Sequence, residues 1–574
     1  MKALAAAYVL GLVPALVLGV FQPVWSRVDE PAHYDVIAQY AAGVYPHDSV
    51  TTIRPQTLEV MQRTGVYGFI VDAAYAEPDL SGGFQSIPPG ISAPAHVLWI
   101  RRHGFEFSYE AFQPPLYYAV ATPFWMLGNA VGGALGTVYA VRILDALLAA
   151  LLAPLALLIS LRLWPANPSV AWGAAVLTAF MPGVALNLTA ITNDVLASVL
   201  GGACILIAIS GSWTRKRVLI LGLLFGGALL TKTTTAAIAP ALAVALLLRN
   251  RGGGWKPLIT SGVVAALCVT PWLISNLAIY GELITTKEQL AMAAFPPRTA
   301  DPDFWTVSTL HAFVTFWAGD PFLSLPGAVA ITLMAALVTA LSIAGALHAW
   351  RRGLPGLSRD AVAVVALAAA GAALVSATTP VLAAFNAPGR FAYVALPAVT
   401  ALVTAGLWVE LRSARLRRAV LGTFATLSVV GLALLDFTPA ATFVNAGVPR
   451  IAQEHPLGVR QSFGPLTVGA LTCAVDGSGN SWLLVRMTNT GDTPVEWSQS
   501  VDVYSGSTHV TTSDYRRSTP FPDILKPGFS YSGWLWLGPS ERLQRLNTTR
   551  VVLKNVATDG YKTVGDLEIP TALC

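Results

Sequence analysis

Two acidic residues and a histidine stand together just after the first apolar run, in the segment Arg27-Val28-Asp29-Glu30-Pro31-Ala32-His33-Tyr34. Adjacent carboxylates beside a histidine at a membrane face are suited to general acid–base chemistry or to holding a metal ion. Asp29 as a helix N-cap, with Pro31 early in the helix, explains the same residues structurally. Spacing alone gives the two interpretations equal weight.

A second polar segment, Tyr109-Glu110-Ala111-Phe112-Gln113-Pro114-Pro115-Leu116-Tyr117-Tyr118, begins another apolar run. A Pro-Pro pair at a helix start, followed by aromatic residues of a membrane interface, has a structural explanation. Taken alone, the segment therefore predicts a helix start, and we keep Gln113 as a candidate substrate-binding residue.

Further polar side chains stand at the outer ends of apolar runs, where ionisable groups are costly and are functional candidates. They are Arg142, Asn193-Asp194, Lys232, and the residues Arg390 and Tyr393 of Asn386-Ala387-Pro388-Gly389-Arg390-Phe391-Ala392-Tyr393. A single Lys or Arg can simply extend its side chain to the interface. Three cations and two carboxylate sites on one face, however, suit a bound phosphate and a hydroxyl that loses its proton.

The composition defines the kind of chain that must position these residues. Of 574 residues, 54% are hydrophobic and only 12% are charged, and the mean hydropathy is +0.59. A soluble domain carries about 25% charged residues, so a soluble globular protein is excluded. The net charge of +5 gives no indication of nucleic-acid binding. We predict a polytopic α-helical membrane protein.

Eleven apolar runs are near the roughly 20 residues that a membrane-spanning helix needs. They are 3–20, 139–161, 169–188, 195–212, 218–232, 234–249, 257–279, 326–349, 361–380, 391–411 and 418–436. A further run, 115–131, decides the topology. If it does not cross, the clustered Lys and Arg residues between spans fall on the side of Lys2, as the positive-inside rule favours. We expect eleven spans, with the N-terminus in the cytoplasm of a bacterial cell and the C-terminus outside.

This topology places the long loop 21–136 outside, and a loop of that length is usually functional. From about residue 445, short alternating runs are broken by turn sequences such as Asn489-Thr490-Gly491-Asp492 and Lys526-Pro527-Gly528. Such a pattern is typical of strands and turns. We therefore divide the chain into a transmembrane domain, 1–444, and an extracytoplasmic all-β sandwich domain, 445–574.

The cysteines and tryptophans give two expectations about the β domain. Cys204 and Cys268 fall within spans and should be inert thiols, whereas Cys473 and Cys574 would lie outside, where disulfides persist. We expect these two to be bonded, which would anchor the chain end. The tryptophans of the domain either stack on a glycan or pack in its core; they are Trp482, Trp497, Trp534 and Trp536.

Taken in order, the motifs resemble the GT-C superfamily of membrane glycosyltransferases. That superfamily includes the dolichyl-phosphate-mannose protein mannosyltransferases and the bacterial lipid A aminoarabinose transferases. The resemblance covers about 20–400 and rests on Asp29-Glu30, Pro-Pro-Leu-Tyr-Tyr, Arg142, Asn193-Asp194, the Leu-Leu-Thr-Lys run ending at Lys232, and Gly389-Arg390. The Asp-Glu-Pro-Ala-His-Tyr form is closest to a bacterial branch of the superfamily.

The resemblance implies an enzyme that moves a sugar from a polyprenyl-phosphate carrier to a cell-envelope glycan, lipid or protein on the outer face. It implies that Asp29 is the general base and that Glu30 positions the acceptor or tunes that base. Lys232 and Arg390 would hold the departing phosphate, with Arg142 in support.

His33 and Asp194 are further substrate-binding candidates of this resemblance, beside Gln113 and Tyr393. We name no firm cofactor and no metal ligand, although the pair Asp29-Glu30 could bind a divalent cation. Metal dependence is left open.

Two other classes of function stay in view. A transporter or flippase for a lipid-linked saccharide would show repeat symmetry and broken helices near the midplane, whereas here the polar residues gather on one face and no repeat is found. A non-catalytic partner of envelope assembly would use its β domain alone. Within the enzyme class, a ligase with diphosphate-linked donors is not excluded by the sequence.

Overall fold

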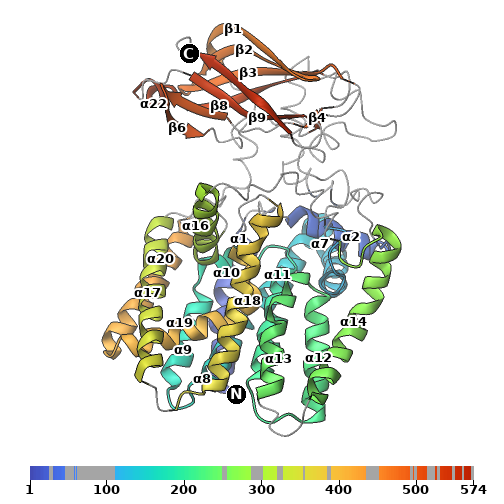
Figure 1. The fold of residues 1–574 in the computed structure, drawn as a ribbon, viewed down its shortest axis with the longest axis vertical. Helices are drawn as coiled ribbons and strands as arrows, with labels where there is room; N and C mark the ends of the chain where they lie inside the picture. The colour runs from blue at the N-terminus through green and yellow to red at the C-terminus, as the bar shows by residue number, and fades with distance from the viewer. Residues whose placement is uncertain are drawn as a thin grey trace. The chain divides into compact units, whose positions relative to one another are not determined.

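The chain forms two compact units (Figure 1), seen here in a computed structural model. Met1–His47 with Glu110–Phe437 make the helical unit, and Asp48–Tyr109 with Thr438–Cys574 make the β unit. The predicted boundary at 444/445 stays a prediction. The structure describes residues 1–22, 24, 30–45, 57, 60, 110–248, 255–285, 302–319, 327–352, 356–383, 389–434, 451–491, 495–496, 501–512, 524–525, 530–545, 550–558 and 562–570.

The first part of the helical unit follows the predicted apolar runs closely. Its elements are α1 (Lys2–Phe21), α2 (Glu30–Ala41), α7 (Leu116–Ala149), α8 (Leu152–Leu163), α9 (Pro168–Ala179), α10 (Pro182–Asn187), α11 (Asp194–Ala208), α12 (Arg215–Leu229), the 3₁₀ helix η2 (Thr233–Ile238) and α13 (Ala239–Leu248). Figure 1 shows α2 at the end of this unit opposite the N-terminus.

The second part continues with longer helices. They are α14 (Lys256–Tyr280), α16 (Pro302–Ala318), α17 (Ala328–Arg352), α18 (Arg359–Ala383), the 3₁₀ helix η3 (Gly389–Ala395), α19 (Leu396–Glu410) and α20 (Ala414–Ala433). The helix α16 lies in a segment for which the sequence predicted no helix.

Seven helical segments of the described chain are long and apolar enough to cross a membrane. Shorter apolar helices accompany them at Pro168–Ala179, Asp194–Ala208 and Thr233–Leu248. Leu267 of α14 and Leu333 of α17 are 67% and 66% exposed on the protein surface, as expected where lipid rather than water is the solvent. The chain is thus a multi-pass membrane protein, and the number of eleven spans stays a prediction.

The helix α7 reverses direction at Gly133, so it is a hairpin rather than one rod. Gly133 has φ +60° and ψ −149°, outside the helical region. A Cβ on Gly128 would clash with the carbonyl oxygen of Gly136, although eight residues of straight helix span about 12 Å. The predicted non-crossing run 115–131 is the first arm of this hairpin, and its depth in the bilayer stays a prediction.

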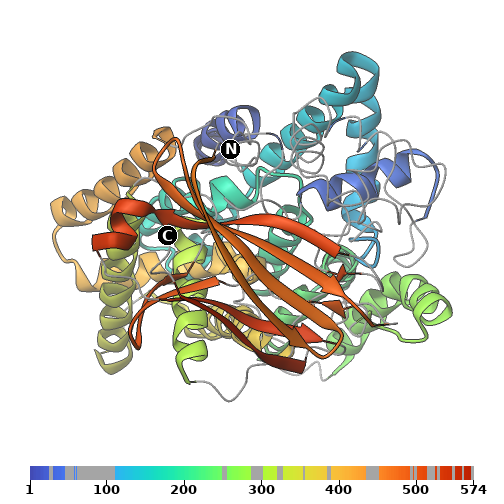
Figure 2. The same cartoon turned by 90° about the horizontal axis from the view of Figure 1, so that it is seen from above.

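The β unit is built on two four-stranded antiparallel sheets, with strand orders β1-β2-β3-β8 and β10-β9-β5-β6, and on the pair β4-β7. The strands are β1 (Ile451–Phe463), β2 (Leu466–Asp476), β3 (Asn480–Asn489), β4 (Val495–Glu496), β5 (Val501–Ser505), β6 (Thr508–Thr512), β7 (Ile524–Leu525), β8 (Ser530–Pro539), β9 (Arg550–Thr558) and β10 (Lys562–Pro570), with the short helix α22 (Ser540–Arg545). Figure 2 shows these strands running side by side.

A shared apolar core makes the two sheets a sandwich, as predicted. Leu483 and Leu535 of the first sheet belong to the same buried cluster as Val551 and Ile569 of the second. Successive residues of a strand face opposite sides, so the neighbours of Leu483 and Leu535 lie on the other face of their sheet.

Two tryptophans of that other face are packed and do not offer a surface for sugars. Trp482 and Trp534 are only 5% and 4% exposed and cluster with Ala474. The glycan-stacking alternative is therefore wrong for these two side chains, which take the packing role. Trp497 lies outside the described residues.

The turn between β2 and β3 is closed by Asp476. Its carboxylate accepts hydrogen bonds from the backbone N–H groups of Ser478 and Asn480, at 2.8 and 2.9 Å, and from Trp482 Nε1 at 2.8 Å. Partial burial would raise the pKa of this carboxyl group, but these hydrogen bonds outweigh it and hold the pKa below its usual value. The ionised form of Asp476 thus stabilises the hairpin.

The cysteines lie where the sequence places them, as far as the structure describes them. Cys204 is buried and Cys268 half-buried, and both are free thiols. Cys473 is fully buried in β2. Cys574 lies outside the described residues, so its bond to Cys473 stays a prediction.

Candidate functional site

Glu30 of α2 and Arg142 of α7 form a buried bidentate ion pair. Arg142 Nε and Nη2 each lie 2.7 Å from one oxygen of the Glu30 carboxylate, and Arg142 Nη1 donates to the carbonyl oxygen of Gln22 at 2.6 Å. Both side chains are 0% exposed. Glu30 is the first residue of α2, where the helix dipole favours a negative charge. Arg142 therefore fixes the start of α2.

A second carboxylate, Asp145, joins this pair and was missed by the sequence analysis. Tyr117 Oη donates to Asp145 Oδ2 at 2.8 Å, and the Thr192 N–H lies 3.4 Å from the same oxygen. Asp145 Oδ1 is buried without a hydrogen-bond partner among the described groups. The signal was its spacing, because residues three apart on a helix share a face and Asp145 follows Arg142 at that distance.

Asp194, Lys232 and Arg390 form a second buried charge group. Lys232 Nζ donates to Asp194 Oδ1 at 2.5 Å, and Arg390 Nε lies 3.7 Å from Asp194 Oδ2. The three side chains are at most 10% exposed. The structure thus brings together three residues that the sequence proposed separately as substrate-binding.

Three elements and one aromatic ring hold this group. Asp194 begins α11, Lys232 stands in extended backbone (φ −158°, ψ 128°) just before η2, and Arg390 belongs to η3. The ring of Phe391 lies 5.1 Å from Lys232 Nζ and 5.9 Å from Arg390 Cζ. An aromatic face at such distances attracts cations, so Phe391 supports both.

The loop before α11 joins the two charge groups. The Ile191 N–H donates to Glu30 Oε1 at 3.2 Å. The next residue, Thr192, has its N–H near Asp145 and its hydroxyl 3.5 Å from Asp194 Oδ2. The two groups are therefore parts of one buried polar site.

Two further candidates, His33 and Gln113, interact with residues of or beside the second charge group. His33 Nδ1 lies 2.9 Å from Tyr118 Oη, and an electrostatic interaction links His33 to Asp194. Gln113 Oε1 accepts from Asn193 Nδ2 at 3.4 Å, beside the second charge group.

Tyr393 is fully buried, and its hydroxyl donates to the Phe316 carbonyl oxygen at 2.8 Å. That bond ties η3 to α16. A substrate-binding role for Tyr393 stays a prediction.

Asp29 lies outside the described residues. Within the described chain, His, Cys, Asp and Glu side chains do not gather in threes that could hold a metal ion.

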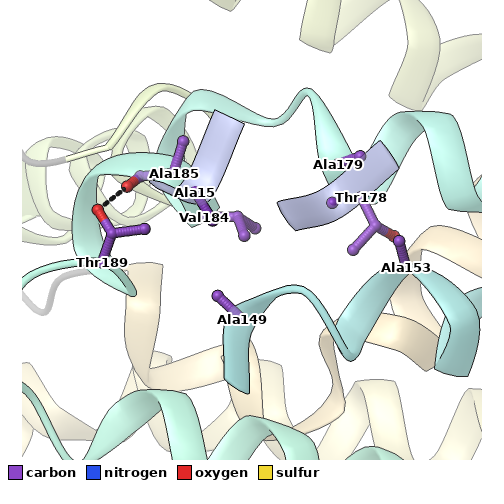
Figure 3. Close-up of a pocket in the computed structure, with 9 residues that line it drawn as sticks. Ala15, Ala149, Ala153, Thr178, Ala179, Val184, Ala185 and Thr189 are labelled. Atoms are coloured by element: carbon purple, nitrogen blue, oxygen red, sulfur yellow. Dashed lines mark hydrogen bonds between the residues drawn. The ribbon is translucent and has the colours of Figure 1, made fainter. Parts of the chain in front are cut away.

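A separate small cavity does not suit a substrate. It measures about 10 Å³ and is lined by small side chains such as Ala15, Ala149, Thr178 and Thr189. Figure 3 shows Thr189 turned towards the preceding helix α10, where its hydroxyl donates to the Ala185 carbonyl oxygen. Such a volume holds at most about one water molecule, so this cavity reflects imperfect packing of small residues.

Comparisons with known proteins give limited information. No protein-family model matches the sequence, and no curated protein matches it. One solved structure that is similar is the crystal structure of ArnT from Cupriavidus metallidurans bound to undecaprenyl phosphate. The identity is 15% and the TM-score 0.42, and the match covers 78% of this chain and 66% of that chain. A similarity of this degree does not define the function of this chain.

Proposed function

We propose that this chain is a GT-C-type membrane glycosyltransferase. It would move a sugar from a polyprenyl-phosphate-linked donor to a cell-envelope glycan, lipid or protein acceptor on the external face of a bacterial plasma membrane. The observation that carries the proposal is the buried cluster in which Lys232 and Arg390 both lie against the carboxylate of Asp194. The three side chains are at most 10% exposed. Ionisable groups so deeply buried are functional candidates, and two cations that share one carboxylate suit an additional anion such as a lipid phosphate.

The two cations would stabilise the leaving group. During transfer the acceptor hydroxyl attacks the anomeric carbon, and the bond from that carbon to the phosphate oxygen breaks with both electrons passing to the phosphate. Negative charge therefore grows on the phosphate. Positive groups fixed in a water-poor site stabilise such charge more strongly than water does.

The acceptor proton would go to Asp29. Its neighbour Glu30 has its two oxygens occupied by Arg142, which suits a positioning role better than proton transfer. Arg142 would then act on the reaction through Glu30. His33, Gln113 and Tyr393 would line the site around the sugar, and the β unit, placed outside by the predicted topology, would stand on the acceptor side.

The test is sugar transfer by the purified chain from a radiolabelled polyprenyl-phospho-sugar. Asp29→Asn should slow transfer by about 10²–10⁴-fold, the range for loss of a general base, while donor binding persists. Asp360→Asn is the matched control, because Asp360 is an exposed carboxylate at the start of α18. Near wild-type turnover of Asp29→Asn would remove Asp29 from the role. Transport of intact donor without transfer would favour a flippase instead.

A further inference from the structure

The carboxylate of Asp194 already contacts the two cations that a donor phosphate would bind. Lys232 Nζ binds one of its oxygens and Arg390 Nε lies near the other. A phosphate that binds both cations must therefore compete with a fixed negative charge that already does so.

The contacts of Asp194 fix its carboxylate in place, so we expect it to stay there when an anion binds. It begins α11, where the helix dipole favours negative charge. The Thr192 hydroxyl lies 3.5 Å from Asp194 Oδ2, and the backbone N–H of Asp194 donates a hydrogen bond to Thr192 Oγ1 at 3.2 Å. Its side chain is 3% exposed, so little water screens it.

A fixed charge opposes each ligand in proportion to the charge of that ligand. Coulomb repulsion doubles when the ligand carries two negative charges instead of one. Across a few ångströms at an effective dielectric constant near that of a protein surface, each ligand charge costs about tenfold or more in affinity. Asp194 therefore weakens a doubly charged ligand by the square of the factor that it imposes on a singly charged one.

We infer that Asp194 sets the charge selectivity of the phosphate site, favouring a lipid-linked phosphodiester with one negative charge over a lipid diphosphate with two or more. The inference rests on the proposed function and names the donor class within it. It also applies to the product, since a lipid monoester phosphate gains a second charge near pH 6–7. Asp194 would then oppose the product more than the donor and so favour product release.

The test compares two lipids with the same hydrocarbon chain, farnesyl methyl phosphate and farnesyl diphosphate, by equilibrium binding to the full chain in nanodiscs. In Asp194→Asn we expect affinity to rise at least about tenfold for the diester and at least about a hundredfold for the diphosphate. The preference for the diester thus falls at least about tenfold. Asp194→Glu and the control Asp360→Asn keep the wild-type preference, because neither removes charge from the site.

An equal change for both lipids, or weaker binding of both, would overturn the inference. Weaker binding would mean that Asp194 only positions the cations. Asp194→Ser removes the same charge and serves if the Asn variant does not fold. If the wild type binds the diester and Asp194→Asn keeps the same preference for the diester over the diphosphate, this inference is wrong but the proposed function is not affected. If the wild type binds neither lipid, both the proposed function and this inference are wrong.

Discussion

The Glu30–Arg142 pair gives a prediction whose size can be worked from the structure. Both side chains are 0% exposed and share two 2.7 Å contacts. Removing one partner of a buried pair leaves an uncompensated charge and costs about 3–5 kcal/mol. We expect Arg142→Met to reach the upper part of this range, because methionine removes the cation that binds both oxygens of the buried Glu30 carboxylate.

Glu30→Gln should cost less, about 3 kcal/mol, because glutamine keeps one oxygen for Arg142 and the Gln22 carbonyl oxygen still accepts from the guanidinium. The double variant Glu30→Gln/Arg142→Met should be more stable than the sum of the two losses predicts, by about 2 kcal/mol, since it removes both charges. Equilibrium unfolding in mixed micelles with increasing dodecyl sulfate measures these free energies.

The matched control is the exposed pair of His348 and Glu410 in the same unit, whose side chains are 47% and 25% exposed. Glu410→Gln should change the unfolding free energy by no more than about 1 kcal/mol. If Arg142→Met costs no more than Glu410→Gln, the Glu30–Arg142 pair is not desolvated and the reasoning fails.

Three further predictions concern packing, covalent structure and pH. A Cβ on Gly345 would lie against the Gly406 carbonyl oxygen of the packed helix α19, so Gly345→Ala should destabilise the helical unit by at least about 1–3 kcal/mol, whereas Gly262→Ala, with open space around it, should be neutral or stabilising. Peptide mapping without reductant should find Cys473 bonded to Cys574, and alkylation of both thiols would contradict this. The pKa of Asp476 is lower in the folded than in the unfolded chain, so the ionised carboxylate stabilises the fold above the unfolded pKa, and this stabilisation is lost as pH falls through the folded pKa. Asp476→Asn should therefore make the unfolding free energy of the β unit less sensitive to acid. An unchanged pH profile of unfolding in this variant would contradict the prediction.

The elements of the helical unit could be predicted because a membrane-spanning helix is recognised from the hydrophobicity of a local stretch of sequence. Each of the eleven predicted runs overlaps one or more observed helices. The helix α16 escaped notice because its segment mixes Pro, Asp and aromatic residues, which resembles an external loop. The reversal at Gly133 depends on packing between the two arms of α7, and composition does not report that.

The site residues could be named, but their partners could not. Glu30 and Arg142 are 112 positions apart, and Asp194 and Lys232 are 38 apart; such pairings follow from helix packing in three dimensions. Asp145 was overlooked because it lies inside an apolar run, although its spacing from Arg142 places both on one helix face. Trp482 and Trp534 could not be assigned to packing before the strand faces were known.

The most direct measurement of the central claim is a cryo-electron microscopy structure of the chain with a bound polyprenyl-phospho-sugar. The account predicts the phosphate between Lys232 Nζ and the Arg390 guanidinium, at the roughly 2.7–2.9 Å of charge-assisted hydrogen bonds. It also predicts the anomeric carbon on the side of Asp29. A phosphate bound elsewhere, with Lys232 and Arg390 both still on Asp194, would contradict it.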